Sequence, residues 1–184
     1  RQQRDKRQYL HNCLANEVIA LGNHLNIEKN NYRAWQKGWF GKSIGFRAPS
    51  NFISTLSRKA LNTGGKVEVI EPWQAKLSQR CHVCNGYHKK PLSQRTHTCN
   101  GKPIAQRDLY SAALALYYTQ EEKAVNMFQF QKDWPDLDTV LKNAMLTLMN
   151  TQVAGQKVPE SLIPNQIEKR VSIHTSLRVP EQTE

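Results

Sequence analysis

The chain has few acidic residues, and they are scarcest in its first half. Its 184 residues include 15 Asp and Glu against 26 Lys and Arg, a formal net charge of +11. Residues 1–100 carry 17 basic and 5 acidic side chains, a balance of +12, and residues 101–184 carry 9 and 10, a balance of −1. A basic surface attracts phosphates. We therefore expect the first half to face nucleic acid; a basic protein without such a partner is the alternative.

The sequence also lacks a long apolar run and a signal peptide. A membrane-spanning helix needs about 20 consecutive apolar residues, so we expect no membrane partner. The chain begins with Arg1 rather than methionine. We expect it to be a piece of a longer polypeptide, with the upstream part as one of its partners.

Cysteine is scarce and unevenly placed. Cys13 stands alone, whereas Cys81, Cys84 and Cys99 lie within 19 positions. A disulfide framework spreads an even number of cysteines along a secreted chain, so this pattern favours intracellular metal binding. The Cys81-x-x-Cys84 spacing lets two thiolates face one Zn²⁺, and Cys99 supplies a third. The fourth ligand is open between His82, His88 and His97, and a cysteine loop that holds its shape without metal is the alternative.

Hydrophobic periodicity predicts an α/β layer architecture. Apolar residues at helical spacing (Leu10, Leu14, Val18 and Leu21) predict a helix over 5–22 with that face buried. Alternation predicts strands over 24–29 and 66–70. Between them we expect a polar, aromatic loop over 30–49 and a helix over 51–62, capped by Ser50 and ended by Gly64-Gly65.

The second half of the chain is predicted to begin with a cysteine-containing insertion over 76–103. A helix over 105–118 follows, with Leu109, Ala112, Ala113 and Leu116 facing inward. We expect residues 120–131 to be helical, a break at Asp133-Trp134-Pro135, and a further helix over 136–150. From residue 153 the chain is polar and is expected to be an extended or disordered tail.

Two carboxylates stand out because acidic residues are so few. Residues 1–110 contain Asp5, Glu17, Glu28, Glu68, Glu71 and Asp108. Glu28 ends a predicted strand, a usual position for functional groups in α/β folds, and Asp108 lies at the start of a predicted helix. Either residue alone is most simply a solvated or dipole-complementing carboxylate. Brought together, they would hold two Mg²⁺ ions for phosphodiester hydrolysis.

Basic side chains in or beside the predicted loops are candidates for phosphate contacts. They are Lys42, Arg47, Lys76, Arg80, Lys89, Lys90, Arg95 and Arg107. Aromatic residues lie between them, and Trp35, Trp39 and Phe46 are expected either to stack on bases or to be buried under the loop.

Several of these segments together resemble the C-terminal half of TnpB nucleases and the related type V CRISPR effectors. The match covers about residues 10–118. Its most specific segments are Lys76-Leu77-Ser78-Gln79 with the cysteines, Lys90-Pro91-Leu92-Ser93-Gln94-Arg95, and Gln106-Arg107-Asp108-Leu109-Tyr110-Ser111-Ala112. Supporting segments are Ile27-Glu28-Lys29, Gly41-Lys42-Ser43, Arg47-Ala48-Pro49 and Gly64-Gly65-Lys66.

The resemblance implies the C-terminal portion of a RuvC-like, RNase-H-type fold with an inserted zinc ribbon. It divides the chain into a RuvC-like segment (1–75), the ribbon (76–103) and a final RuvC-like helix (104–119). The residues that follow lie outside the resemblance, and their pattern predicts an appended helical extension (120–152) and a polar tail (153–184). It implies an RNA-guided, Mg²⁺-dependent DNA endonuclease from a prokaryotic cytoplasm, with guide RNA and target DNA as partners.

The resemblance also assigns residues. Glu28 matches the second RuvC acidic residue, Asp108 the third, and Cys81, Cys84 and Cys99 match three of four ribbon cysteines. Gly101 stands where the fourth cysteine is expected. The first RuvC aspartate has no match, since Asp5 lies in a basic helical stretch. The fragment alone is therefore expected to be inactive. A nuclease-inactive, RNA-guided DNA-binding protein and a zinc-ribbon interaction protein are the alternatives.

Overall fold

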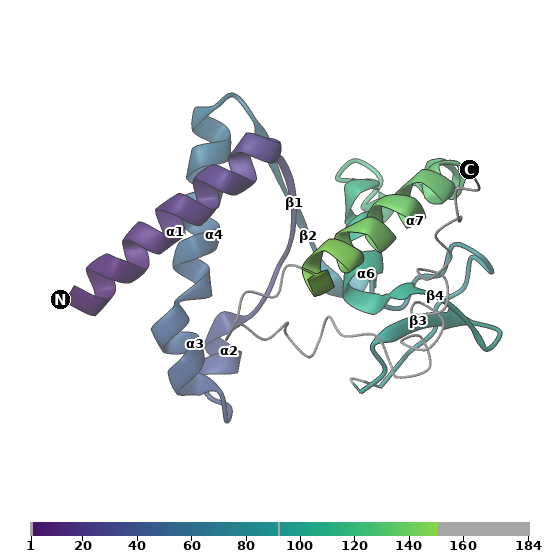
Figure 1. Cartoon of the computed structure of the whole chain (residues 1–184), viewed down its shortest axis with the longest axis horizontal. Coiled ribbons are helices and arrows are strands. Elements are labelled where there is room, and N and C mark those ends of the chain that lie inside the picture. The colour runs from purple at the N-terminus through teal and green to yellow at the C-terminus, as the bar shows by residue number, and fades with distance from the viewer. Residues whose placement is uncertain (1, 92, 151–184) are drawn as a thin grey trace, which may run out of the picture. The chain divides into compact units, whose positions relative to one another are not determined.

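The computed structural model describes residues 2–91 and 93–150, which form a mixed α/β structure (Figure 1). They divide into two compact units. The first comprises the described residues up to Ala75 together with Gln120–Lys123, and the second those from Lys76 to Thr119 and from Ala124 onward. The tail expected from residue 153 lies outside the described residues.

The first unit places helices beside a small parallel sheet. Its elements are α1 (Gln2–Leu21), β1 (His24–Glu28), α2 (Tyr32–Gln36), α3 (Gly41–Arg47), α4 (Pro49–Asn62), β2 (Lys66–Ile70) and α5 (Pro72–Ala75). Strands β1 and β2 pair in parallel, with His24 opposite Lys66 and Glu28 opposite Ile70. Parallel pairing requires a crossover, which α2 to α4 provide. Both predicted strands are confirmed.

Two local predictions in this unit are wrong. Residues 30–49 are not an open loop, because α2 and α3 form within them. Ser50 does not cap α4, because the helix already begins at Pro49 after Ala48, whose φ is 46°. Proline suits the first helical position, where its missing N–H costs nothing. The predicted end of α4 is confirmed, with Thr63 as C-cap and Gly64 at φ 73°.

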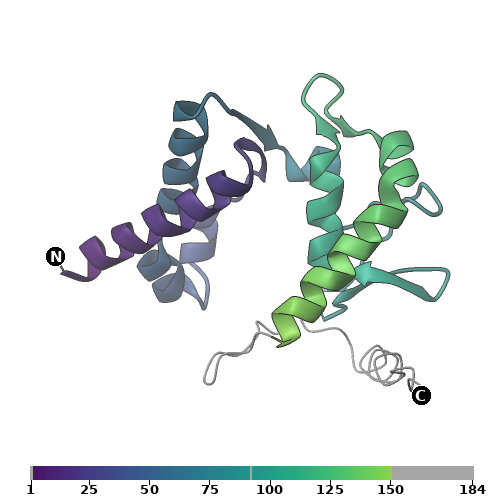
Figure 2. The ribbon, with the colours of Figure 1, turned by 45° about the horizontal axis from the view of Figure 1, so that its top comes forward.

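Helix α1 packs against α4, and the two lie side by side in Figures 1 and 2. Its buried residue is Ala15, whereas Leu10, Leu14 and Leu21 are exposed, so the predicted buried face is wrong. Helix α4 contributes Thr55, Leu56 and Ala60 to the contact side. Small residues allow close approach of two helices, and periodicity alone does not show which face a partner covers.

The second unit combines a cysteine-containing loop, two β-hairpins and two helices. Its elements are β3 (Thr96–Cys99), β4 (Lys102–Gln106), α6 (Arg107–Leu116), β5 (Tyr118–Thr119), β6 (Ala124–Val125) and α7 (Met127–Asn150). Strands β3 and β4 are antiparallel, as are β5 and β6. The predicted helix over 120–131 is therefore wrong for residues 120–126, where the β5–β6 hairpin lies, and confirmed for residues 127–131, which begin α7. Residues 105 and 106 also belong to β4 rather than to the predicted helix.

Helix α7 continues through Pro135, so the predicted break is wrong. Proline removes one helical hydrogen bond, a cost that tertiary packing can offset. Phe130 is fully buried, and the Trp134 ring packs 5.5 Å from it, on the side of the helix that faces Tyr110 of α6 and His82. Among the described residues, no helix combines the length and the apolar character needed to cross a membrane.

Candidate metal centre

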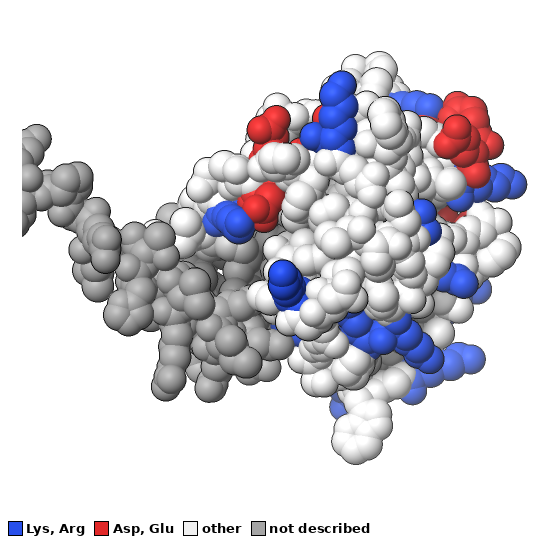
Figure 3. All heavy atoms as spheres, turned by 90° about the vertical axis from the view of Figure 1, so that its right-hand side faces the viewer, with Lys and Arg blue, Asp and Glu red and all other residues white. Residues whose placement is uncertain are grey.

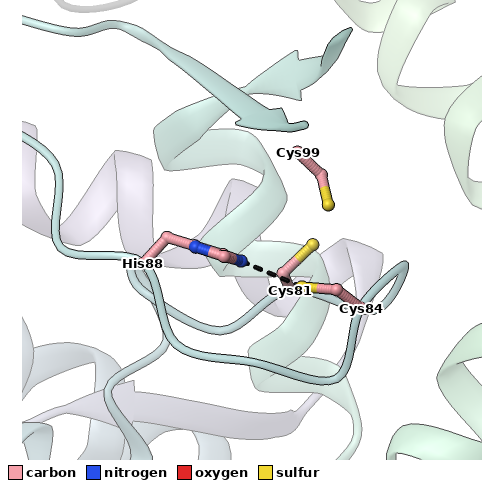
Figure 4. A group of neighbouring side chains, drawn as sticks. All are labelled: Cys81, Cys84, His88 and Cys99. Carbon is pink, nitrogen blue, oxygen red and sulfur yellow. Dashed lines mark hydrogen bonds between the residues drawn. The ribbon is translucent and has the colours of Figure 1, made fainter. Parts of the chain in front are cut away.

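Three cysteines and one histidine of the second unit converge on a single point (Figure 4). The ligand atoms of Cys81, Cys84, His88 and Cys99 all lie within 4.8 Å of one another. Cys81 and Cys99 are buried, Cys84 is exposed, and His88 is partly exposed. Cys99 comes from the end of β3, whereas the other three come from one loop. We refer to residues 79–88 as the metal loop.

The metal loop is closed by backbone hydrogen bonds. Cys81 N–H donates to the Gly86 carbonyl at 3.0 Å, and His88 N–H donates to the Gln79 carbonyl at 2.7 Å. Asn85 adopts a φ of 55°, a left-handed conformation that asparagine tolerates. The chain therefore reverses between Cys84 and His88, which brings the His88 Nε2 atom to 2.9 Å from the Cys84 sulfur.

The hairpin turn explains why Gly101 is not a ligand position. Asn100 and Gly101 have φ values of 49° and 75°, and Cys99 pairs with Lys102 across them. This is the two-residue turn that Asn-Gly sequences favour, and Gly101 has no side chain to offer. His88 occupies the fourth position from the other side of the cluster.

Two of the ligands, Cys84 and Cys99, differ in acidity. The hydrogen bond from His88 lowers the pKa of Cys84 to about 6. Burial raises the pKa of Cys99 to about 11. The Cys84 thiol is therefore largely ionised at neutral pH, whereas Cys99 ionises when a bound cation offsets the cost of its burial.

The donor set fits a metal such as zinc. Three thiolates and one imidazole form an ordinary structural zinc set, and tetrahedral Zn–S bonds of about 2.3 Å separate the ligand atoms by a little under 4 Å. Three of these residues were expected from the sequence, and His88 was one of three histidines left open.

His97 and His82 are instead part of a buried aromatic cluster. The His97 ring stacks on Tyr110 at 4.2 Å, and neither of its nitrogens has a hydrogen-bond partner among the described residues. Burial lowers the pKa of His97 to about 3, which keeps it neutral. The His82 Nδ1 atom and backbone N–H both contact the Tyr110 hydroxyl, at 2.8 and 3.0 Å. The prediction of His97 as a possible ligand is therefore not supported.

Helices α6 and α7 hold the metal loop through this cluster. Tyr110 of α6 is fully buried, and Trp134 of α7 lies 4.5 Å from the His82 ring. Gln131 of α7 donates to the His82 carbonyl and to Asn85 Oδ1. Sequence reasoning missed these positioning residues. The available signal was Phe130 and Trp134, four positions apart and so on one helical face.

The inward face of α6 differs from the prediction. Tyr110, Ala113 and Leu114 are buried, whereas Ala112 and Leu116 are exposed. The covering elements are β3, β4 and α7, and they select a face centred on Tyr110.

Glu28 and Asp108 lie at the ends of regular elements, as expected. Glu28 is the last residue of β1, and it is exposed. The surrounding protein still removes part of the water around its carboxyl and raises its pKa. Asp108 lies in the first turn of α6, exposed, with its Oδ1 atom 3.2 Å from Arg107 Nε. Because they belong to separate units, their meeting at one Mg²⁺ site stays a prediction.

Arg107 departs from its predicted role as a phosphate contact. Only 9% of the residue is exposed. Its Nη1 atom donates to the carbonyls of Pro91 and Gln94, at 3.3 and 3.1 Å. The guanidinium therefore joins α6 to the segment before β3, a structural position.

The other predicted basic residues reach the surface to different degrees. Lys42, Arg47, Lys76 and Lys89 are exposed, and Arg80, Lys90 and Arg95 are partly exposed. The Arg80 guanidinium lies 4.7 Å from the centre of the exposed Tyr87 ring. In the lower part of the face shown in Figure 3, Lys and Arg occur without Asp or Glu beside them.

Comparison of the chain with protein-family models, with curated proteins and with solved structures gave no significant match.

Proposed function

We propose that the chain is the C-terminal nuclease portion of an RNA-guided DNA endonuclease with a RuvC-like fold, which hydrolyses phosphodiesters with Mg²⁺. The observation that carries the proposal is the position of Asp108. Its exposed carboxylate lies in the first turn of α6, directly after the β3–β4 hairpin that carries Cys99 of the Cys₃His cluster. In the same chain, Glu28 is the last residue of the parallel strand β1.

The local structure of both carboxylates suits a hard cation. Mg²⁺ prefers carboxylate oxygens and keeps several waters, so its ligands must be reachable from solvent, as Glu28 and Asp108 are. A bound cation would favour the ionised form of Glu28, whose pKa is raised by partial loss of water around its carboxyl. When bound, Mg²⁺ stabilises charge on the attacked phosphate. The carboxylates of Glu28 and Asp108 would hold it, and Arg80 of the metal loop, with Lys76 and Lys90 beside that loop, would contact the strand backbone.

The zinc cluster has a structural part in this proposal. It holds the metal loop against β3, and so places Lys76, Arg80 and Lys90 on one support. Lys90 donates to the His88 carbonyl at 3.2 Å, and Arg80 stacks on Tyr87. Ordered cations lose less entropy when they bind phosphates than free side chains do.

The test is Mg²⁺-dependent plasmid cleavage by the complete polypeptide with its co-purified RNA. Asp108→Ala should reduce cleavage below detection and leave target binding intact, because the carboxylate acts on the metal rather than on the DNA. Asp136→Ala is the matched control, since Asp136 is an exposed carboxylate of α7 in the same unit. Full cleavage by Asp108→Ala would remove Asp108 from the site.

A nuclease-inactive, RNA-guided DNA-binding protein is the second candidate. Both acidic residues that precede β1, Asp5 and Glu17, lie on α1 rather than on a strand, and Asp5 pairs with Arg4 at 3.6 Å. A third carboxylate for a two-metal site must then come from outside residues 1–27. Tight target binding without cleavage by either protein would favour this candidate. Absence of RNA and of salt-dependent DNA binding would favour a zinc-ribbon interaction protein.

A further inference from the structure

The segment between β1 and α4 exposes its aromatic side chains although its turns are closed by hydrogen bonds. Trp39 is completely exposed, and Phe40 and Phe46 are 77% and 61% exposed. Trp35 of α2 is also exposed. Single exposed aromatic residues are ordinary on protein surfaces, but four exposed within 12 positions of the sequence are a concentration that points to a binding segment. We call residues 32–47 the α2–α3 platform.

The platform is built as a rigid support. The Asn31 side chain accepts from Ala34 N–H at 3.0 Å and so caps α2. Gly41 N–H donates to the Gly38 carbonyl at 2.9 Å. A side chain at Gly41 would overlap the Gln36 carbonyl, so glycine is required where α3 turns back on α2. Arg7 of α1 donates to the Phe46 carbonyl at 2.6 Å and ties the platform to the rest of its unit.

The charge around these rings indicates a polyanionic occupant. No Asp or Glu occurs between Glu28 and Glu68, whereas Arg33, Lys37, Lys42 and Arg47 all lie within the platform and are exposed. An apolar protein surface would gain nothing from four exposed cations. A nucleotide strand presents phosphates to cations and base faces to aromatic rings.

We propose that the α2–α3 platform binds an unpaired nucleotide strand, with Trp39 as the principal stacking residue and Lys42 and Arg47 as phosphate contacts. Paired bases hide their faces, so a duplex would engage the cations without the rings. The inference deepens the proposed function and rests on it only for the origin of the strand, either guide RNA or opened target DNA.

The test measures how tightly the 184-residue chain binds fluorescent oligonucleotides without Mg²⁺. The ligands are oligo-dT and oligo-U of about 15 nucleotides, a length that covers one such site, and a duplex of the same length. We expect Trp39→Ala to raise the Kd for single strands roughly 10- to 100-fold, the loss expected for one stacked base. Trp39→Phe should retain most of the affinity. Trp73→Ala is the matched control, because Trp73 is also exposed but follows Glu71 and Pro72 outside the platform. Because Trp39 is completely exposed, the variant should keep the native circular dichroism spectrum.

The charge component is tested separately. The double variant Lys42→Ala, Arg47→Ala should lower the slope of log K against log salt by about 0.7 for each phosphate that is no longer neutralised. Preference for oligo-U over oligo-dT would identify RNA as the strand, and equal affinity would identify any unpaired strand. Unchanged single-strand affinity in Trp39→Ala, or an equal weakening with the duplex, would overturn the inference and leave an acidic protein as occupant.

These outcomes are distinguishable from those of the cleavage test. A chain that binds single strands through Trp39 but never cleaves contradicts the nuclease proposal alone. Cleavage that depends on Asp108, with Trp39→Ala binding unchanged, contradicts the platform alone.

Discussion

Trp134 and Trp39 show how differently the two units of this protein use one residue type. In the second unit Trp134 packs against His82, Tyr110 and Phe130 and supports the metal loop. In the first unit Trp39 is completely exposed on a hydrogen-bonded turn. An aromatic ring stabilises the fold in one place and is open to a ligand in the other.

The two units also differ in how they are stabilised. The second gathers four potential metal ligands beside one buried aromatic cluster and two short β-hairpins. The first depends on the packing of α1 against α4 and on the parallel pair β1–β2. We therefore expect perturbations of the metal and of the aromatic cluster to affect one unit and spare the other.

Of the changes that test this difference between the units, removal of the metal should have the largest effect on stability. Structural Zn²⁺ contributes about 10–16 kcal/mol of apparent binding free energy to small domains, so a chelator should unfold the metal loop and the β3–β4 hairpin. Hydrogen exchange read by mass spectrometry should show reduced protection in residues 79–106 and retained protection in α1 and α4. Equal protection in both units with and without metal would show that the metal loop and the β3–β4 hairpin hold their shape alone.

Substitution of the two tryptophans should give the next largest difference. Trp134→Ala should lower the free energy of unfolding of the second unit by about 2–4 kcal/mol, because it opens space beside Tyr110 and Phe130. Trp39→Ala should change stability by about 0.5 kcal/mol or less, since the ring is completely exposed. Urea unfolding of each variant measures both values. A similar destabilisation in the two would mean that the platform is part of a core.

The smallest effect is expected for His97→Phe. Phenylalanine keeps the stack on Tyr110 and removes two buried nitrogens that have no hydrogen-bond partner in the part of the chain that the structure describes, so stability should change by about 1 kcal/mol or less. Zinc content by atomic absorption should stay at the wild-type value. His88→Phe is the matched control and should lose zinc, because it removes the fourth ligand. Loss of zinc in His97→Phe with retention in His88→Phe would reverse the ligand assignment.

Local pattern was sufficient for several elements of the fold. Neighbours in the sequence are enough to predict strands β1 and β2, the end of α4 at Gly64, and the pairing of Cys81 with Cys84 at one site. Alternation and Cys-x-x-Cys spacing act over a few residues, where the chain itself limits geometry. The continuation of α7 through Pro135 could not be predicted from local pattern, because Phe130 and Trp134 pack against His82, which is distant in the sequence.

The sequence by itself determined the basic first half, the three thiolates and the isolation of Glu28 and Asp108 among few acids. Only the tertiary structure decided that His88 rather than His97 completes the cluster, that Arg107 is buried, and that Trp39 is exposed. Composition and spacing are properties of the chain alone. Burial and ligand choice depend on which distant segments pack together, and so appear only in the folded protein.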